Sequence, residues 1–421
     1  MHHVGTVVVL AAGKGTRMRS NLPKVLHEVC GRPLLGWVLD QAKALGPERI
    51  VVVTGHEEEL VRGYVQEREF DERISFAHQA VQNGTGHAVQ VAMDEFRGTS
   101  GACVILYGDM PLIRAETLVR LVGQLATARA AATVATPDEP RGFGRIVRDE
   151  NGRFAGIVEE KDCSPKQRAI REVNVGVYAF QTSDLETLLP MLTSDNAQGE
   201  LYLTDVLTKL VEREHPVATV ELEELEESIG INTLAHLAEA GRAIQFRIHE
   251  RHLANGVKIV DPGTTYIDHD VEIGAGTEIL PCTVIRGGVS IGEGCEVGPF
   301  THLRVGTRLD DGAEIGNFCE AKKSRIGSGT KAKHLTYLGD VTIGSKSNIG
   351  AGTIVANYDG KHKHKTQIGD RAFVGSGSIL IAPCQVGDGA LTGGGAVVTR
   401  NSEIPENEAW VGVPARPLKR G

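Results

Sequence analysis

A six-residue period runs through the chain from Ile267 onwards and restricts the fold of this part more than any other feature. Each unit of six can supply one short strand and one turn, with an aliphatic side chain pointing inward, and three units can close one triangular coil. The pattern therefore predicts a left-handed parallel β-helix of hexapeptide repeats over residues 261–421. The first nine positions of the period are all apolar: Ile267, Ile273, Ile279, Ile285, Ile291, Val297, Leu303, Leu309 and Ile315.

The repeat is broken in two places, and charged residues gather at both. The register slips at Ala321-Lys322-Lys323, where we expect Glu320, Lys322 and Lys323 to take inward apolar positions. A later insertion runs from Tyr358 to Thr366 and carries lysines and histidines. Charged breaks in a strict repeat point to a function beyond packing.

The first 230 residues follow a different pattern. Apolar runs at 6–10, 49–54 and 103–107 read as buried strands, and segments with helical spacing, such as Leu34 to Ala42, lie between them. Strands that alternate with helices predict an α/β, Rossmann-like domain with a parallel sheet. We assign residues 1–230 to this domain, 231–260 to a linker helix and 261–421 to the β-helix.

Composition excludes several classes of protein. The net charge is -9, with 45 Lys and Arg against 54 Asp and Glu, so we expect no nucleic-acid partner. Seven cysteines stand at irregular spacing without a CxxC pair, which favours reduced thiols and disfavours a thiolate zinc site. The apolar run from Val7 to Ala12 is too short for a membrane span. We therefore predict a cytoplasmic protein without a membrane span.

The first strand runs into a glycine-rich loop, Leu10-Ala-Ala-Gly-Lys-Gly-Thr-Arg-Met18, and Pro23-Lys24 follows. Gly13 and Gly15 would let backbone N–H groups approach an anion, and nearby cations would neutralise it. The spacing fits neither GxGxxG nor the Walker motif, which disfavours a dinucleotide site or a P-loop NTPase. A tight strand–helix turn without a ligand is the alternative.

The glycine-rich loop resembles the signature of sugar-nucleotide pyrophosphorylases, and further blocks follow in the order of that group. Together with the hexapeptide tail, they resemble the family of bifunctional N-acetylglucosamine-1-phosphate uridylyltransferases / glucosamine-1-phosphate acetyltransferases. The matching blocks are Gln79, Gln82-Asn-Gly-Thr-Gly-His-Ala88, Tyr107-Gly-Asp109, Gly142-Phe-Gly-Arg145, Val158-Glu-Glu-Lys-Asp162, Asn174-Val-Gly176, residues 196–205 and Gly230-Ile-Asn232.

The resemblance implies uridylyl transfer from UTP to N-acetylglucosamine 1-phosphate, with release of pyrophosphate. Arg17 and Lys24 would neutralise the phosphates, which suits a reaction that depends on charge neutralisation and positioning. Gln79 would read the uracil. The other residues implied for UTP or the product are Leu10, Ala11, Ala12, Gly13, Gly84, Thr85, Tyr107, Gly108, Asp109, Gly144, Glu159, Asn174 and Asn232.

The resemblance also implies that Asp109 and Asn232 hold Mg²⁺, a cation that prefers hard oxygen ligands. Asp109 comes just after a buried strand, and ligands bind at the carboxyl ends of strands in such sheets. Turn or helix capping is the alternative for Asp109, and Asn232 could cap the linker helix. Asn83 departs from the family pattern, where an apolar residue is expected.

The β-helix would carry the second reaction, acetyl transfer from acetyl-CoA to glucosamine 1-phosphate. His334 matches the general base, a role for a group that titrates near neutrality, and Glu320 would orient it or stabilise its charge. The implied sugar-phosphate residues are Arg304, Lys322, Tyr337, Asn348 and Tyr358. The implied acetyl-CoA residues are Ala351, Asn357, Tyr358, Ser376 and Gly394. Lys363 is a further candidate for the active-site phosphate or for the coenzyme. Sites of the family form between subunits, which implies a homotrimer.

Two features of the C-terminal part depart from the family. Gly412 stands where members place an arginine that contacts the coenzyme, and Arg416 or Lys419 are the possible substitutes. Few coils precede Arg304. The alternatives are therefore a monofunctional sugar-1-phosphate nucleotidyltransferase with the β-helix as a trimerisation scaffold, and a non-catalytic regulatory subunit. The histidines of the inserted loop could instead bind a metal.

Overall fold

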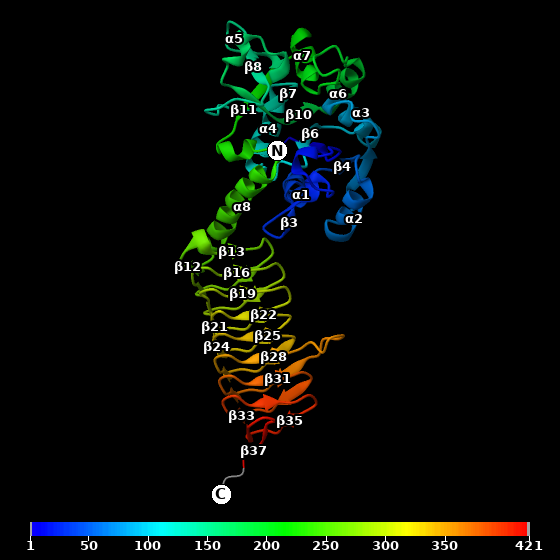
Figure 1. The fold of residues 1–421 in the computed structure, drawn as a ribbon. Helices are drawn as coiled ribbons and strands as arrows, with labels where there is room; N and C mark the ends of the chain where they lie inside the picture. The colour runs from blue at the N-terminus through cyan, green and yellow to red at the C-terminus, as the bar shows by residue number, and fades with distance from the viewer. Residues whose placement is uncertain (1, 419–421) are drawn as a thin grey trace. The chain divides into compact units, whose positions relative to one another are not determined.

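A computed structural model describes residues 2–418 and divides the chain into two compact units that part between Ala243 and Ile244 (Figure 1). The first unit has one mixed sheet of nine strands. They are β1 (Val4–Leu10), β4 (Arg49–Thr54), β5 (Ile74–His78), β6 (Ala102–Tyr107), β7 (Ala130–Ala135), β8 (Arg145–Arg148), β9 (Phe154–Val158), β10 (Val173–Gln181) and β11 (Val217–Glu221).

The main path of the sheet has the order β11-β7-β10-β6-β1-β4-β5. β1 pairs in parallel with β4 and β6, and β4 with β5, so their carboxyl ends meet at one edge. β10 is antiparallel to both of its neighbours on this path. The expected Rossmann-like domain is therefore confirmed, with one strand of this path reversed.

Helices cover both faces of this sheet and bury two apolar clusters against it. On one face α1 (Leu34–Ala44), α2 (Glu58–Arg68) and α4 (Ala115–Gly123) contribute to the core, and on the other α3 (Thr85–Phe96), α6 (Thr182–Leu188) and α7 (Thr204–Glu212) do so. Burial on both faces explains why the strands read as continuous apolar runs rather than as alternating ones. The remaining elements of this unit include a hairpin of β2 (Glu28–Val29) and β3 (Arg32–Pro33), and the short helix α5 (Pro165–Arg168).

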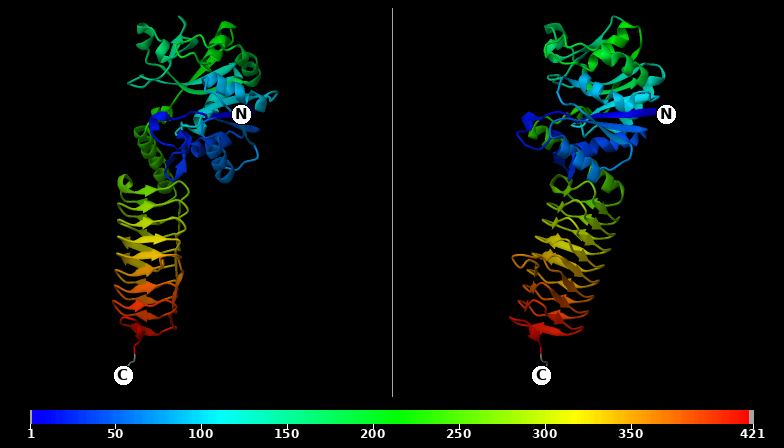
Figure 2. Two further views of the ribbon diagram at one scale, coloured as in Figure 1. Left: turned by 45° about the vertical axis from the view of Figure 1, so that its right-hand side comes forward. Right: turned by 90° about the vertical axis from the view of Figure 1, so that its right-hand side faces the viewer.

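The second unit is the predicted β-helix, built from three parallel sheets that we call sheets I, II and III (Figure 2). Sheet I holds β12 (Lys258–Ile259), β15 (Glu278–Ile279), β18 (Glu296–Val297), β21 (Glu314–Asn317), β24 (Lys331–His334), β27 (Asn348–Ile349), β30 (Phe373–Val374), β33 (Leu391–Thr392) and β36 (Ala409–Val411), with β37 (Arg416–Pro417) antiparallel at its end.

Sheet II holds β13 (Tyr266–Ile267), β16 (Val284–Ile285), β19 (His302–Leu303), β22 (Glu320–Lys322), β25 (Tyr337–Gly339), β28 (Ile354–Ala356), β31 (Ile379–Ile381) and β34 (Val397–Val398). Sheet III holds β14 (Glu272–Ile273), β17 (Ser290–Ile291), β20 (Arg308–Leu309), β23 (Arg325–Ile326), β26 (Val341–Ile343), β29 (Thr366–Ile368), β32 (Cys384–Val386) and β35 (Glu403–Ile404). The chain visits the sheets in the order I, II, III in every coil, and aliphatic side chains of the six-residue period fill the interior.

The breaks in the repeat all lie at the corner between sheets II and III. In sheet III, Ile291 pairs with Leu309 after a full coil of three hexapeptides. Leu309 then pairs with Ile326, and Ile326 with Ile343, and each of these coils is shorter by a single residue. The coil from Ile343 to its partner Ile368 is longer, because the inserted loop occupies the same corner. Two shortened corners and one lengthened corner are therefore stacked in consecutive coils.

The expectation that Glu320, Lys322 and Lys323 take inward positions is wrong. Ala321 is fully buried and keeps the six-residue period, while Glu320 and Lys322, on either side of it in β22, are only half-buried. Alternate residues of a strand face opposite sides, so the two charged side chains point outward. The one-residue slip comes after Ala321, at the corner.

Helix α8 (Leu234–Ala254) begins in the first unit and ends in the second. The side chain of Thr233, rather than that of Asn232, accepts a hydrogen bond from the His236 N–H at its start (3.2 Å). Asn232 is therefore not needed as the cap. Within residues 2–418, no helix combines the length and the hydropathy that crossing a membrane requires.

Candidate functional site

Four of the predicted nucleotide and metal residues converge at the carboxyl edge of the first unit's sheet. The Lys24 ammonium pairs with the Asp109 carboxylate and donates to Asn232 Oδ1 at 3.2 Å. Arg17 Nη2 donates to the same Asn232 oxygen at 2.9 Å. Asp109 follows β6, and its carbonyl accepts the Ile231 N–H, which brings the Gly230-Ile-Asn232 segment beside it. Two cations and two oxygen-bearing side chains thus meet at one place.

The glycine-rich loop lies against this group. Leu10 ends β1, and the Ala11 N–H donates to Val53 O. Gly15 has a φ of 58°, and a Cβ there would lie 2.6 Å from Lys24 Cβ. Only glycine therefore allows both the left-handed turn and the close approach of Lys24.

The predicted uracil-reading segment begins directly after β5. Gln79 is buried, and its N–H donates to Thr54 O. Gly84 precedes α3 with a φ of 98°, and a Cβ there would lie 2.6 Å from Leu201 O. Gln82 Nε2 donates to Ala12 O at 2.5 Å, which ties this segment to the glycine-rich loop. The structure therefore brings the two predicted nucleotide segments together.

The predicted sugar residues form a second group on β10, directly after β9 and in the loop before β8. The Asn174 N–H donates to Gly144 O, and a Cβ on Gly144 would lie 3.4 Å from Glu159 Oε2. Burial raises the pKa of Glu159, whose Oε1 accepts from Thr204 Oγ1 at 3.4 Å. Burial also raises the pKa of Tyr107, and the carboxylates of Glu159 and Asp109 add to that shift. The charges of both groups of residues therefore act on Tyr107.

In the second unit, the predicted base His334 ends β24 and is exposed. Its Nδ1 lies 2.8 Å from Asn317 Oδ1, the side chain one coil earlier in sheet I. Glu320 instead pairs with Arg304 Nη1 at 2.6 Å. Among the described residues, the side-chain partner of His334 is Asn317, a residue to which sequence reasoning assigned no role.

The predicted phosphate residues gather at the corner between sheets II and III. The neighbouring ammonium of Lys363 lowers the pKa of Lys322, and Arg304 adds to this effect. Positive charges held close together stabilise an anion that is placed between them. Tyr337 lies on sheet II in the coil after Lys322, whereas Asn348 lies on sheet I. The structure therefore does not place all predicted sugar-phosphate residues on one face of a single chain.

The inserted loop is held by contacts that the sequence did not predict. Asp359 Oδ2 accepts from His364 Nε2 at 2.7 Å and lies 3.3 Å from Arg400 Nη2. Hydrogen bonds from the His362 N–H and His364 lower the pKa of Asp359 well below its usual range. Asn357 Nδ2 donates to Asp340 Oδ2 at 2.5 Å. These bonds hold the loop, and with it Tyr358 and Lys363, beside the corner.

Three of the five predicted coenzyme residues, Ala351, Ser376 and Gly394, form one row at the corner between sheets I and II, whereas Asn357 and Tyr358 follow β28 at the corner between sheets II and III. Backbone bonds connect this corner from coil to coil: Gly352 N–H to His334 O, Gly377 N–H to Ala351 O, and Gly395 N–H to Ser376 O. Ala351, Ser376 and Gly394 thus follow His334 along the axis of the β-helix. Gly412 occupies the same corner of the next coil, because the Val397 N–H donates to its carbonyl. Arg416 is exposed in β37, and Lys419 lies outside the described residues.

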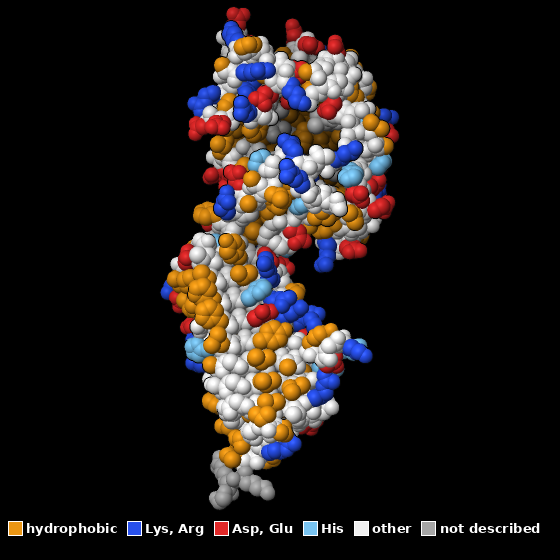
Figure 3. Space-filling view, viewed as in Figure 1, with side chains coloured by type: hydrophobic (Ala, Val, Ile, Leu, Met, Phe, Trp, Pro, Cys, Tyr) orange, Lys and Arg blue, Asp and Glu red, His pale blue; other side chains and the backbone are white. Residues whose placement is uncertain are grey.

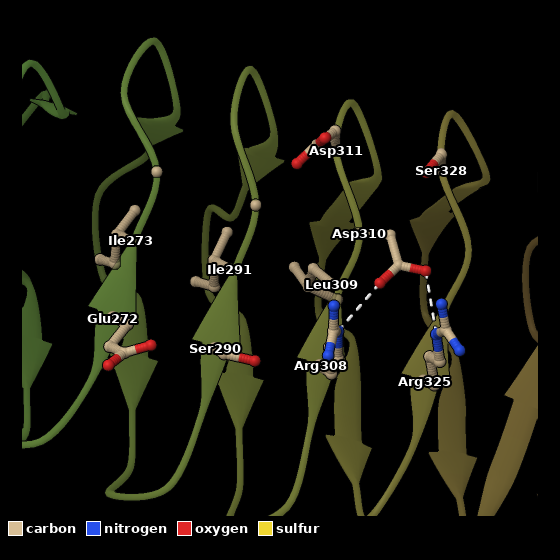
Figure 4. A pocket seen from close by; sticks show the side chains of 12 residues that line it. Glu272, Ile273, Ser290, Ile291, Arg308, Leu309, Asp310, Asp311, Arg325 and Ser328 are labelled. Carbon is tan, nitrogen blue, oxygen red and sulfur yellow. Dashed lines mark hydrogen bonds and ion pairs between the residues drawn. The ribbon is translucent and has the colours of Figure 1, made fainter.

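A separate hollow lies on the outer face of sheet III and is lined by none of the predicted site residues (Figure 4). Arg308 Nε and Arg325 Nε donate to the two oxygens of Asp310, at 3.0 and 2.9 Å. Its cations are thus already paired. Across residues 2–418, no group of three or more His, Cys, Asp or Glu side chains is arranged to hold a metal ion. This holds for the histidines of the inserted loop as well.

Comparisons with known proteins agree with both units. The model of the MobA-like NTP transferase domain matches residues 7–217, and that of the bacterial transferase hexapeptide (six repeats) matches 270–305 and 365–400. The bifunctional protein GlmU of Trichlorobacter lovleyi is 44% identical over 436 residues, which cover 94% of each chain. The chain belongs to the GlmU family.

Other GlmU proteins match over similar lengths. The bifunctional protein GlmU of Streptococcus suis is 40% identical and covers 98% of this chain and 96% of its own. The bifunctional protein GlmU of Corynebacterium diphtheriae is 43% identical, and the match covers 91% of this chain and 87% of its own. The chain is therefore a bifunctional transferase of UDP-N-acetylglucosamine synthesis, which joins a nucleotidyltransferase to a hexapeptide acetyltransferase. The alternative of a scaffold tail without activity does not describe this family.

Proposed function

We propose that uridylyl transfer takes place where Arg17, Lys24, Asp109 and Asn232 converge, and this convergence is the observation that carries the proposal. UTP lies along Leu10 to Gly13, with its base beside Gln79, Gly84 and Thr85 and its phosphates beside Arg17 and Lys24. N-acetylglucosamine 1-phosphate lies beside Tyr107, Gly108, Gly144, Glu159 and Asn174. The cations then neutralise the charge that builds up as pyrophosphate leaves.

Asp109 and Asn232 are the proposed ligands of Mg²⁺. Their side-chain oxygens both face the Lys24 ammonium, so the pair stabilises a cation at this point. Carboxylate and amide oxygens suit Mg²⁺, which needs few protein ligands where phosphates supply others. When bound, Mg²⁺ would neutralise and orient the phosphates. Lys24 is then free to move towards the substrate.

Acetyl transfer is assigned to the β-helix, with His334 as the base that takes a proton from the amine of glucosamine 1-phosphate. An acceptor at Asn317 Oδ1 leaves the proton on Nδ1 and the lone pair on Nε2, the nitrogen that would act. Arg304, Lys322 and Lys363 bind the phosphate, because their positive charges lie close enough together for Lys363 and Arg304 to lower the pKa of Lys322. Tyr337, Asn348 and Tyr358 contact the sugar, and Glu320 holds Arg304 in place.

The extended arm of acetyl-CoA lies along the corner row of Ala351, Ser376 and Gly394, with Asn357 and Tyr358 at the adjoining corner. Small side chains leave room for a chain molecule beside the backbone. Without an arginine at Gly412, the coenzyme lacks one charged contact at this end. The expected consequence is a weaker affinity for acetyl-CoA rather than a loss of the reaction.

A cytoplasmic homotrimer is part of this proposal. Hydrophobic side chains gather over the later strands of sheet II (Figure 3). Ile354 and Ile379 on this sheet, and Phe373 and Leu391 on sheet I, are all more than a third exposed. These two faces flank the coenzyme row, so packing against other copies would bury them and supply the second wall of the groove. It would also let Asn348 of one copy face the phosphate site of another.

The test is an assay of both reactions in one preparation. The full chain is incubated with glucosamine 1-phosphate, acetyl-CoA, UTP and Mg²⁺, and free thiol and pyrophosphate are followed separately. With N-acetylglucosamine 1-phosphate also supplied, we expect His334→Ala to abolish thiol release but not pyrophosphate release, and Asp109→Ala to abolish pyrophosphate release but not thiol release. Thiol release that survives His334→Ala, or pyrophosphate release that survives Asp109→Ala, would overturn the corresponding assignment.

A further inference from the structure

The orientation of the Gln79 side-chain amide is fixed by its two partners. Gln79 Nε2 lies 3.2 Å from Gly84 O and 3.1 Å from His87 Nδ1. A backbone carbonyl only accepts hydrogen bonds, so the NH₂ group, and not the oxygen, must face Gly84. The same NH₂ group then donates to His87, which requires a lone pair on Nδ1 and places the ring proton on Nε2.

With Nε2 occupied on both sides, Oε1 of Gln79 is left as the free end of the amide. None of the hydrogen bonds of residues 2–418 involves this oxygen, although Gln79 is only 4% exposed. Its backbone is fixed as well, because the Gln79 N–H donates to Thr54 O at 2.8 Å. The side chain therefore presents one hydrogen-bond acceptor of set direction.

We infer that His87 is a specificity-determining residue, which holds Gln79 so that it accepts a hydrogen bond from a pyrimidine with an N3–H. This inference rests on the proposed function, in which Gln79 lies beside the base. Uracil carries a donor at N3, whereas N3 of cytosine is an acceptor. An amide oxygen held towards N3 bonds the first and repels the second. His87 touches Gln79 rather than the nucleotide, so its role is one of positioning.

Gly84 alone does not hold the amide equally well. Its carbonyl also accepts the Ala88 N–H at 3.2 Å, so the Gln79 bond is shared with the first turn of α3. His87 supplies the only other partner of Nε2 among the described residues. If it is removed, the terminal amide can rotate and present its NH₂ group to the base. That orientation favours the N3 acceptor of cytosine.

The experiment compares kcat/KM for UTP and for CTP, with N-acetylglucosamine 1-phosphate and Mg²⁺ as the other reactants. For His87→Ala we expect the UTP/CTP ratio to fall at least tenfold, through a loss with UTP that CTP does not share. His87→Asn keeps an acceptor and should retain most of the ratio. Gln90→Ala is the matched control, because Gln90 lies on the same helix and donates to Leu189 O instead.

Each outcome decides between the inference and the function on which it rests. An equal loss with both nucleotides in His87→Ala would mean that His87 is merely structural, and the inference would be overturned. If Gln79→Ala leaves the ratio unchanged, Gln79 does not read the base and its proposed role fails. If the wild-type chain releases no pyrophosphate from UTP, the proposed function itself fails.

Discussion

At the scale of single residues, the acetyltransferase site depends on a contact between coils. Asn317 and His334 are register partners in adjacent strands of sheet I, and their side chains meet at 2.8 Å. Because the parallel ladder fixes both backbones, the Asn317 amide of the preceding coil holds the imidazole, and no carboxylate is needed for this. Glu320 is engaged by Arg304, so the amide at position 317 takes the orienting place.

This contact leads to a prediction for Asn317. Asn317→Ala should lower kcat/KM for acetyl transfer about tenfold, a part of the roughly 10²- to 10⁴-fold contribution of a general base, and leave uridylyl transfer unchanged. In Asn317→Asp, a carboxylate beside the ring stabilises the imidazolium, so the acid limb of the pH–rate profile should move to higher pH. The measurement is thiol release from pH 5 to 9. A profile for Asn317→Asp that coincides with that of the wild type would contradict the assigned contact.

The meeting of Lys24, Asp109 and Asn232 could be anticipated in part from the sequence. Asp109 follows a predicted strand, and the carboxyl ends of parallel strands share one edge. The roles of Asn317 and His87 could not, although His87 lies within a motif that the sequence analysis singled out. Asn317 meets His334 only because the two are register partners across a shortened coil, and a local motif does not fix such a register.

At the scale of elements, the corner between sheets II and III explains where the cations of the second site come from. Two shortened corners and one inserted loop are stacked there, which brings Lys322 and Lys363 together. The six-residue period predicted the coils and located two of the three irregular corners, but not the second shortened corner, between Leu338 and Ile343. It did not predict that Ala321 keeps the period, because a small inward residue resembles a gap in an aliphatic pattern.

The second half of helix α8 belongs to the second unit, and its contacts there predict a dependence of stability on pH. Gln245 Nε2 donates to Ile267 O at 3.0 Å, and its Oε1 accepts the Ile267 N–H. His249 and His252 are buried on the same helix. Burial, helped by Arg251 and His249, lowers the pKa of His252 from 6.5 to about 4. The neutral ring is therefore part of the folded state.

The sign of the effect follows from these pKa values. Between pH 6.5 and pH 4 the unfolded helix binds more protons than the folded one, so the docked state should lose stability as the pH falls, by up to about 1.4 kcal/mol per pH unit for each such histidine. Hydrogen exchange of the Ile267 amide, corrected for its intrinsic pH dependence, measures this. His252→Gln should reduce the loss of protection, and an unchanged loss would assign the effect to other groups.

At the scale of the whole molecule, one row of residues with exposed apolar side chains has a left-handed backbone conformation, which is unfavourable for any residue with a Cβ. Phe300, Phe318 and Leu335 stand at the corner between sheets I and II with φ of 53°, 56° and 49°, and each is more than half exposed. The rings of Phe300 and Phe318 stack with their centroids 5.2 Å apart. A left-handed conformation costs about 1 to 2 kcal/mol for a residue with a Cβ, and later coils use glycine at this corner. Bulky apolar residues there are therefore poorly explained by the fold of one chain alone.

Contact with other copies of the chain would explain this row, and Phe318 provides the test. Phe318→Gly removes the ring and relieves the backbone. The free energy of unfolding of the isolated chain should therefore equal that of the wild type or exceed it by up to about 1 kcal/mol. The same change should weaken the trimer, and Phe318→Glu should weaken it more, because association would then bury a charge. Sedimentation at several protein concentrations gives the association state, with Phe70→Glu, at an exposed phenylalanine of the first unit, as the control.

In dissociated variants we expect acetyl transfer to fall and uridylyl transfer to persist, because only the acetyl-CoA groove is proposed to need a second chain. A trimer of unchanged strength in Phe318→Glu would remove this corner from the interface, and full acetyl transfer by a dissociated variant would show that one chain completes the site.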